Sequence, residues 1–178
     1  KSKGGTTPFW GNQWLFSAEV GLDDVLSDTD LLKLQFQTAM LRTYQNNHLF
    51  YAKASLGAIL VEDINQVPAS MRFFAGGDQS IRGFKYESIS PEENGVLLGG
   101  KYLATGTLEY NYQFAPSWRA ALFVDGGTST NDFSEDINVG AGIGIRWLTP
   151  VGPIRIDHAW AITDNNNTRF SVTIGPEI

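Results

Sequence analysis

Near the middle of the chain lies the stretch Phe73-Phe74-Ala75-Gly76-Gly77-Asp78-Gln79-Ser80-Ile81-Arg82-Gly83-Phe84. It belongs to a connection of roughly forty residues, 61–100, whereas most connections in compact domains have about four to six. The stretch holds three glycines, three phenylalanines and a single arginine. A connection of this length and composition can fold back on the molecule, so we expect it to be functional and ordered.

Alternation of apolar and polar residues dominates the rest of the chain. This period of two is the pattern of a half-buried β-strand, and no segment shows a convincing helical period. The sequence therefore predicts an all-β antiparallel fold of about eight strands. The alternating runs cover residues 12–22, 32–42, 49–61, 101–114, 118–125, 138–147, 154–162 and 169–174.

The connections between these runs alternate between tight turns and longer segments rich in Asp and Asn. Short turns at one end and long loops at the other are typical of transmembrane β-barrels. Aromatic side chains of the apolar face cluster beside the tight turns, as a membrane-interface belt requires: Trp14, Tyr112, Phe114, Trp118 and Trp147. A soluble sandwich or lipocalin-like barrel also alternates. The polar face favours the membrane barrel, because it carries Gly, Gln, Asn and Thr more than Lys and Glu.

Composition excludes several other classes of function. The net charge of −6 without a basic cluster argues against nucleic acid as a partner. The absence of cysteine removes disulfides and thiol chemistry. His158 and His48 are the only histidines, and His158 faces away from its neighbour Asp157, so we expect no metal, no cofactor and no catalytic triad. Asp23, Asp24, Asp28 and Asp30 fit a hydrated external loop as well as a cation site.

The central stretch, extended to Arg72, resembles the signature loop of the outer-membrane assembly-factor superfamily, which includes BamA, TamA and the two-partner-secretion transporters. The best match within the family is the C-terminal half-barrel of TamA. Further stretches follow in the family's order: 106–110, Phe123-Val124-Asp125-Gly126-Gly127, 146–154 with Asp157 after it, and 174–178.

The resemblance implies a sixteen-stranded barrel in the outer membrane of a Gram-negative bacterium, preceded by periplasmic POTRA domains. Its sixth extracellular loop would fold into the lumen, held there by the loop arginine. Ile81, Arg82, Gly83 and Phe84 match the loop motif. Phe123 to Asp125 match the inner-wall motif that receives the arginine.

Alternation by itself agrees with this pairing. Glu109 and Asp125 face the lumen from neighbouring predicted strands, and a guanidinium can bind a carboxylate through two parallel hydrogen bonds. The lumen-facing Gly140, Gly142 and Gly144 leave space for an inserted loop. In the alternative interpretation, Arg82 is a solvated loop arginine and the glycines only allow the strand to bend.

The function implied by the resemblance is non-enzymatic assistance in inserting β-barrel or autotransporter clients into the outer membrane. The seam of the barrel would open, and a client strand would pair with the last strand, where Phe170, Val172 and Ile174 alternate. The expected partners are client proteins, the lipid bilayer and an inner-membrane-anchored subunit. Two rivals are a two-partner-secretion export pore and a passive porin-like barrel.

Residues 1–178 would form the C-terminal part of the barrel domain, without the first strands and without POTRA domains. An open sheet leaves unpaired backbone at both edges, which lipid does not tolerate. We therefore expect these strands to close on themselves or to pair with a second copy as a homodimer. Because a lumen of eight strands is filled by side chains, the long connection would then be expelled unless a second copy widens the barrel.

Overall fold

The computed structural model describes residues 1–5, 8–21, 30–132, 136–165 and 167–175. Its main feature is one antiparallel sheet in the order β1-β2-β3-β4-β7-β8-β9-β10-β11, which confirms the predicted fold class. Within the described residues no helix is long and apolar enough to cross a membrane. The aspartates at positions 23, 24 and 28 and the terminal residues 176–178 fall outside the described part of the chain.

Eight long strands account for the alternating runs. They are β2 (Trp10–Gly21), β3 (Leu31–Tyr44), β4 (His48–Leu60), β7 (Tyr102–Ala115), β8 (Trp118–Thr130), β9 (Asn138–Thr149), β10 (Gly152–Ala161) and β11 (Asn167–Ile174). A short strand β1 (Ser2–Lys3) pairs with the start of β2. β8 runs five residues beyond the predicted end at Asp125, because Gly126 and Gly127 carry no side chain to continue the alternation.

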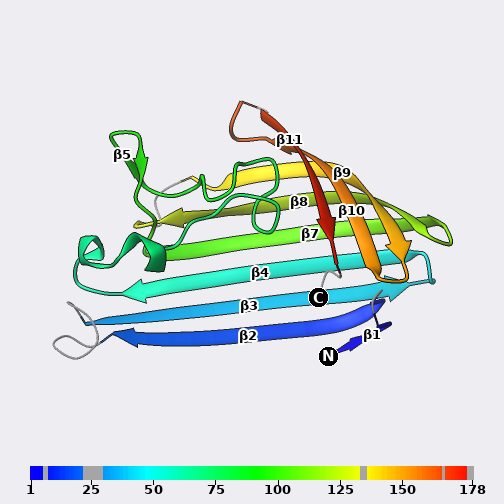
Figure 1. The fold of residues 1–178 in the computed structure, drawn as a ribbon, viewed down its shortest axis with the longest axis horizontal. Coiled ribbons are helices and arrows are strands. Elements are labelled where there is room, and N and C mark those ends of the chain that lie inside the picture. The colour runs from blue at the N-terminus through cyan, green and yellow to red at the C-terminus, as the bar shows by residue number, and fades with distance from the viewer. Residues whose placement is uncertain (6–7, 22–29, 133–135, 166, 176–178) are drawn as a thin grey trace.

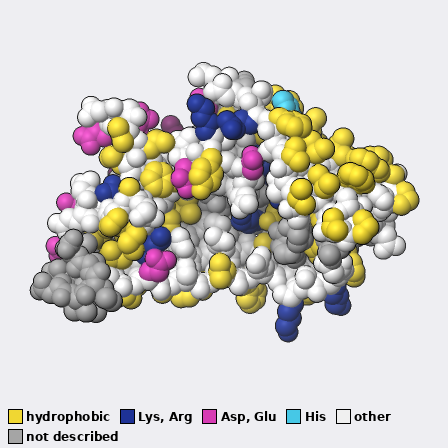
Figure 2. Space-filling model, viewed as in Figure 1, with side chains coloured by type: hydrophobic (Ala, Val, Ile, Leu, Met, Phe, Trp, Pro, Cys, Tyr) yellow, Lys and Arg dark blue, Asp and Glu magenta, His cyan; other side chains and the backbone are white. Residues whose placement is uncertain are grey.

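The sheet has two different faces. On the outer face, large apolar side chains are exposed along every long strand, including Trp14 (77% exposed), Leu108 (63%) and Phe170 (67%). Hydrophobic side chains gather over the turn ends of β8 to β10, at the right of Figure 2. Exposure of so much contiguous apolar surface fits contact with lipid and does not fit contact with water.

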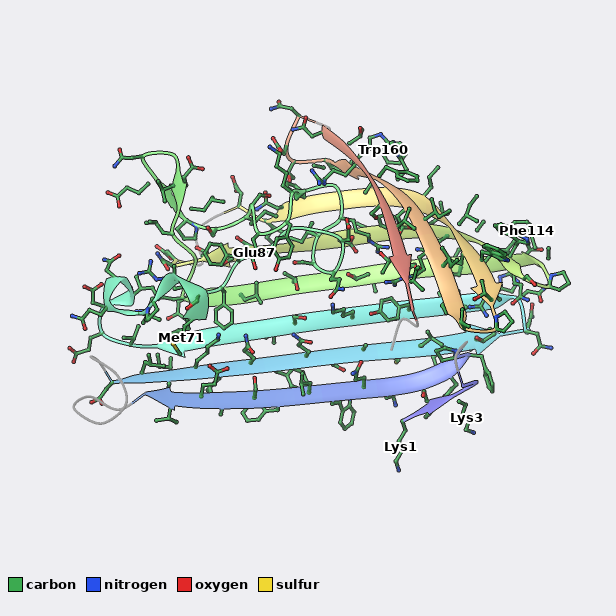
Figure 3. All side chains as sticks on the ribbon, viewed as in Figure 1. Lys1, Lys3, Met71, Glu87, Phe114 and Trp160 are labelled. Atoms are coloured by element: carbon green, nitrogen blue, oxygen red, sulfur yellow. The ribbon has the colours of Figure 1, made fainter. Side chains whose placement is uncertain are left out.

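The long connection (residues 61–101) lies against the inner face of the curved sheet, as Figure 1 shows. It contains the short helices η1 (Ile64–Gln66) and η2 (Ala69–Met71) and the small hairpin β5 (Glu92–Glu93) and β6 (Val96–Leu97). Met71 and Glu87 of the connection lie toward the end of the sheet opposite Phe114 (Figure 3).

Apolar contacts hold the connection to the sheet. Ile81, Phe84, Ala75 and Ile89 form one buried cluster with Ala161 of β10. Val67 and Phe73 form a second cluster with side chains of β3 and β4. Burying a large apolar side chain contributes about 1.5–3 kcal/mol, so these clusters give the connection a defined position on the wall.

Two expectations about closure are wrong for a single chain. β11 pairs only with β10, and β2 pairs beyond β3 only with the two residues of β1, so the described strands form an open sheet. The connection is not expelled, because an open sheet leaves its concave face free to receive it. Pairing with a second copy stays a prediction.

Candidate functional site

The loop backbone presents Arg82 to the inner wall. Two isolated bridges, Phe73 with Gly100 and Ala75 with Ile89, fasten the connection to itself on either side of the turn. Within the turn, the backbone N–H of Gly77 donates to the carbonyl oxygen of Ile81 at 3.2 Å. Ile81 is fully buried, so the apolar residue before the arginine is anchored in the core. The turn is therefore closed on itself before Arg82 leaves it.

Gly83 allows the loop to approach β10 closely. Its φ of +98° is in the region that favours glycine, and a Cβ there would lie 2.7 Å from the backbone nitrogen of Ala161. Phe84 follows directly and packs beside Ala161. The four residues of the predicted loop motif, 81–84, thus have separate contacts: an apolar anchor, a cation, a close backbone approach and a second apolar anchor.

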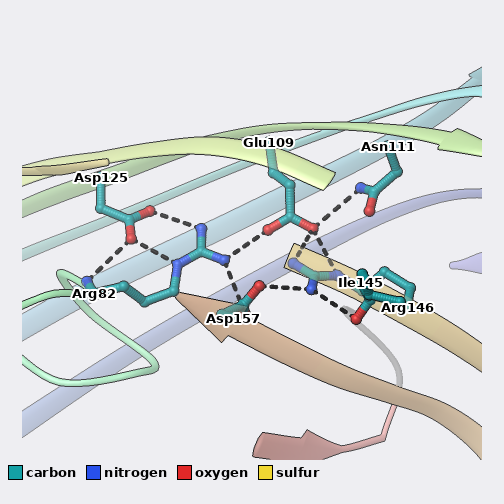
Figure 4. Close-up of polar contacts among 7 residues, drawn as sticks. All are labelled: Arg82, Glu109, Asn111, Asp125, Ile145, Arg146 and Asp157. Atoms are coloured by element: carbon teal, nitrogen blue, oxygen red, sulfur yellow. Dashed lines mark hydrogen bonds and ion pairs between the residues drawn. The ribbon is translucent and has the colours of Figure 1, made fainter. Parts of the chain in front are cut away.

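The guanidinium of Arg82 contacts three carboxylates on three strands (Figure 4). Its Nε and Nη2 donate to the two oxygens of Asp125 at 2.7 and 3.0 Å, which is the bidentate geometry that fits arginine best. Nη1 donates to Glu109 at 2.7 Å and reaches Asp157 at 3.5 Å. The backbone N–H of Arg82 also donates to Asp125 at 3.0 Å. The predicted pairing of the loop arginine with Asp125 and Glu109 is therefore present.

A second arginine, which the sequence analysis did not single out, completes the site. Arg146 of β9 is fully buried, and it donates to Glu109 at 2.9 Å and to Asp157 at 2.6 Å. Asn111 donates to the same oxygen of Glu109 at 3.1 Å. We call Arg82, Glu109, Asp125, Arg146 and Asp157 the Arg82 cluster. Alternation alone places the four wall residues of this cluster on the inner face. The register between the strands then places them side by side at the same height in the sheet.

The charges of the Arg82 cluster nearly balance. Two guanidiniums face three carboxylates, and each of the five side chains is at least nine-tenths buried. Burial by itself would lower the pKa of Arg82, but hydrogen bonding and attraction from Asp125 and Glu109 raise it above its ordinary value. Arg82 therefore stays charged, and removing either arginine leaves its carboxylate partners with an uncompensated buried charge.

An aromatic ring and a line of glycines shape the wall around the arginine. The Cζ of Arg82 lies 3.4 Å from the ring centroid of Phe123, a cation–π contact. A Cβ on Gly140 would collide with the carbonyl oxygen of Arg82, one on Gly142 with the ring of Phe123, and one on Gly144 with the carboxylate of Asp157. The space expected from the glycine stripe is thus taken up by the loop and by the cluster itself.

The predicted client-edge residues are not part of this site. Phe170, Val172 and Ile174 lie on the outer face of β11 and are 67%, 56% and 71% exposed. Their strand is hydrogen-bonded to β10 on one side only. The structure therefore describes two separate features, a docked loop on the inner wall and, at the edge of the described sheet, a strand that is paired on one side.

Comparison with known proteins places this geometry in a family. The model of the Omp85 superfamily domain matches residues 5–178. The outer membrane protein assembly factor BamA of Nitratidesulfovibrio vulgaris is 28% identical over 171 residues, covering 88% of this chain and 22% of that protein. The sorting and assembly machinery component 50 homolog A of Xenopus laevis is 30% identical over 145 residues, covering 70% of this chain and 30% of that protein.

A solved structure has the same fold. The crystal structure of BamA from Haemophilus ducreyi lacking POTRA domains 1–3 superposes with a TM-score of 0.81 at 21% identity, covering 98% of this chain and 40% of that one. The chain thus spans less than a third of the length of each of the two curated relatives named above. The chain is an outer-membrane protein that belongs to the Omp85 superfamily.

Proposed function

We propose that this chain is the part of an outer-membrane protein assembly factor that carries the docked loop and the client-pairing strand β11. The observation that carries the proposal is the combination of family membership with the docking of the connection on the inner wall by the Arg82 cluster. In the full-length protein a client strand would add to β11 through main-chain hydrogen bonds, the mode of recognition known as β-augmentation. No covalent chemistry or nucleotide is needed for such a step.

The Arg82 cluster would hold the docked loop in one position on the wall. A buried ion pair specifies position more than it adds stability, since desolvation offsets much of the attraction. With Arg82 bound to β7, β8 and β10 at once, the loop links three strands of the wall. We infer that the loop keeps this part of the wall rigid, so that movement is confined to the strands at the edge.

The rival of a passive porin has less support. A porin needs a free lumen, whereas here the connection covers the inner face and is bonded to it from Lys53 of β4 to Asp157 of β10. The two-partner-secretion export pore stays the alternative, because the signature loop is common to that branch of the superfamily. The TamA branch, autotransporter clients, an inner-membrane-anchored subunit and a homodimer stay predictions.

Disulfide crosslinking in the full-length protein tests the edge proposal. The chain contains no cysteine, so single cysteines can be placed without background from these residues. We would introduce Val172→Cys in β11 and, as the matched control, Ile143→Cys on the outer face of β9, whose neighbours on both sides are already paired. A stalled client with a cysteine in its terminal strand should crosslink to position 172 and not to 143. Equal crosslinking at both positions would rule out edge pairing.

A further inference from the structure

One cationic side chain lies on the lipid-facing wall. In the described strands β2 to β11 every outward position of the main sheet is apolar, aromatic or uncharged, with the exception of Arg42 in β3. Charges on the lipid face of a barrel are costly near the middle of the bilayer and tolerated near its surfaces. Arg42 is close to the tight turn between β3 and β4, and is paired across strands with Trp10 and Phe50. Its position therefore corresponds to the headgroup level, within the aromatic belt.

Arg42 is held in place but keeps part of its hydrogen-bonding capacity. Its Nη1 donates to the carbonyl oxygens of Gly11 and Leu41 at 2.8 and 2.7 Å, and its Nη2 donates to Asn12 at 2.8 Å. A guanidinium has five N–H groups, so the Nε–H and one Nη2–H are not used by these bonds. No carboxylate of the described residues forms an ion pair with Arg42.

A second cation stands beside the first. Lys3 of β1 is paired across strands with Trp10, which in turn is paired with Arg42. The Nζ of Lys3 and the Cζ of Arg42 lie 5.6 and 4.6 Å from the centroid of the indole ring. Lys3 is the last residue of β1 and lies at the end of the sheet that also carries Phe114 (Figure 3). Two positive charges thus flank one tryptophan at the level of the tight turns.

We propose that Lys3, Trp10 and Arg42 form a binding site for the phosphate group of an anionic phospholipid. The Nε–H and Nη2–H groups of Arg42 that have no partner among the described residues suit a phosphate, and the ammonium of Lys3 adds a second point charge. The indole supplies an apolar body at the headgroup level, where tryptophan is favoured. A lipid phosphate is the occupant that fits best, since the site opens onto the surface that faces the bilayer and has no counter-ion on the described wall.

Native mass spectrometry of the full-length protein in detergent, titrated with dioleoyl phosphatidylglycerol, tests the site. The first bound lipid should dissociate about fivefold more readily for each cation removed, in Lys3→Gln and in Arg42→Gln. Lys33→Gln is the matched control, because it removes a cation from the inner face of the same strand as Arg42. Circular dichroism establishes that each variant keeps its β content.

Several results would overturn the proposal. Lys3→Gln breaks no hydrogen bond of Arg42, so unchanged lipid affinity in that variant would contradict a shared site even if Arg42→Gln misfolds. Equal loss in Lys33→Gln would mean that net charge alone is being measured. Displacement of the lipid by inorganic phosphate at the same concentration would identify a free-phosphate site. Arg42→Lys should give an intermediate affinity, since it keeps the charge and loses the planar fork.

Discussion

Replacing Arg82 by alanine should release the long connection from the wall. The substitution removes the bidentate contact with Asp125, the bond to Glu109 and the longer contact with Asp157. Breaking a buried ion pair by deleting one partner costs about 3–5 kcal/mol, against about 1 kcal/mol or less for an exposed pair. Since the side chains of the Arg82 cluster are almost fully buried, the larger figure applies.

Because the Arg82 cluster has one more anion than cations, removing Arg82 and removing Asp125 should have different effects on docking. Two cations and three anions leave one net negative charge, so Arg82→Ala raises the imbalance to two, whereas Asp125→Ala removes it. After Asp125→Ala, moreover, the guanidinium keeps its bond to Glu109. Asp125→Ala should therefore weaken docking of the connection less than Arg82→Ala does.

Amide hydrogen exchange in the full-length protein measures the docking directly. The backbone N–H groups of Ala75 and Ile89 each donate to the carbonyl oxygen of the other residue at 2.9 Å. We expect these two amides to exchange with solvent when the connection detaches from the wall. A loss of about 3–5 kcal/mol corresponds to exchange faster by about two to three and a half powers of ten. Lys85→Ala is the control, since it removes an exposed cation of the same connection. Amides of β8 and β9 should keep their protection in every variant.

The double variant decides whether the two residues act together. If Arg82 and Asp125 form one interaction, the effects of Arg82→Ala and Asp125→Ala should fall short of additivity by about 1.5 kcal/mol or more. Additive effects, to within about 0.5 kcal/mol, would refute the reasoning, as would exchange in Arg82→Ala that matches the Lys85→Ala control.

Three further substitutions probe how closely the loop fits the wall, each measured by the same exchange experiment. Gly140→Ala should weaken docking by about 1–3 kcal/mol, because its methyl group would collide with a loop carbonyl, whereas Gly106→Ala meets only one atom, at 3.8 Å, and should be tolerated. Gly83→Ala should undock the loop, while Gly95→Ala, with a similar positive φ but open space around it, should show backbone strain alone, about 1–2 kcal/mol. Phe123→Leu should cost about 1 kcal/mol through loss of the cation–π contact, and an unchanged exchange rate would mean that the ring only fills space.

The alternation of residues within each strand was enough to predict which side chains face the lumen. It could not predict which residues of neighbouring strands lie at the same height in the sheet. Glu109 and Asp125 could be assigned to the inner face because side-chain direction in a strand depends only on a period of two. The roles of Arg146 and Asp157 depend on the pairing of β9 with β10, which aligns residue 157 with residue 144, and register is not visible in one strand alone. The same limit applied to the loop, whose position depends on whether the sheet closes, a property of the whole sheet.

The strand register also determines which carboxylates of the Arg82 cluster have a cationic partner on the wall and which has one on the loop. Glu109 and Asp157 are both bonded to Arg146, so each of these carboxylates keeps a cationic partner on the wall whether or not the loop is docked. Asp125 differs, because in the Arg82 cluster its only cationic partner is the loop arginine. The wall thus has one carboxylate whose burial requires the loop. With the loop absent, the Asp125 carboxylate would need water in place of the guanidinium, and that would oppose a dry inner wall. Removal of Asp125 should therefore ease undocking, because the undocked wall no longer carries an unpaired carboxylate. Removal of Arg82 should penalise the docked state, in which Asp125 stays buried without its cation. If the two residues act as one pair, the double variant should undock by less than the sum of the two single effects.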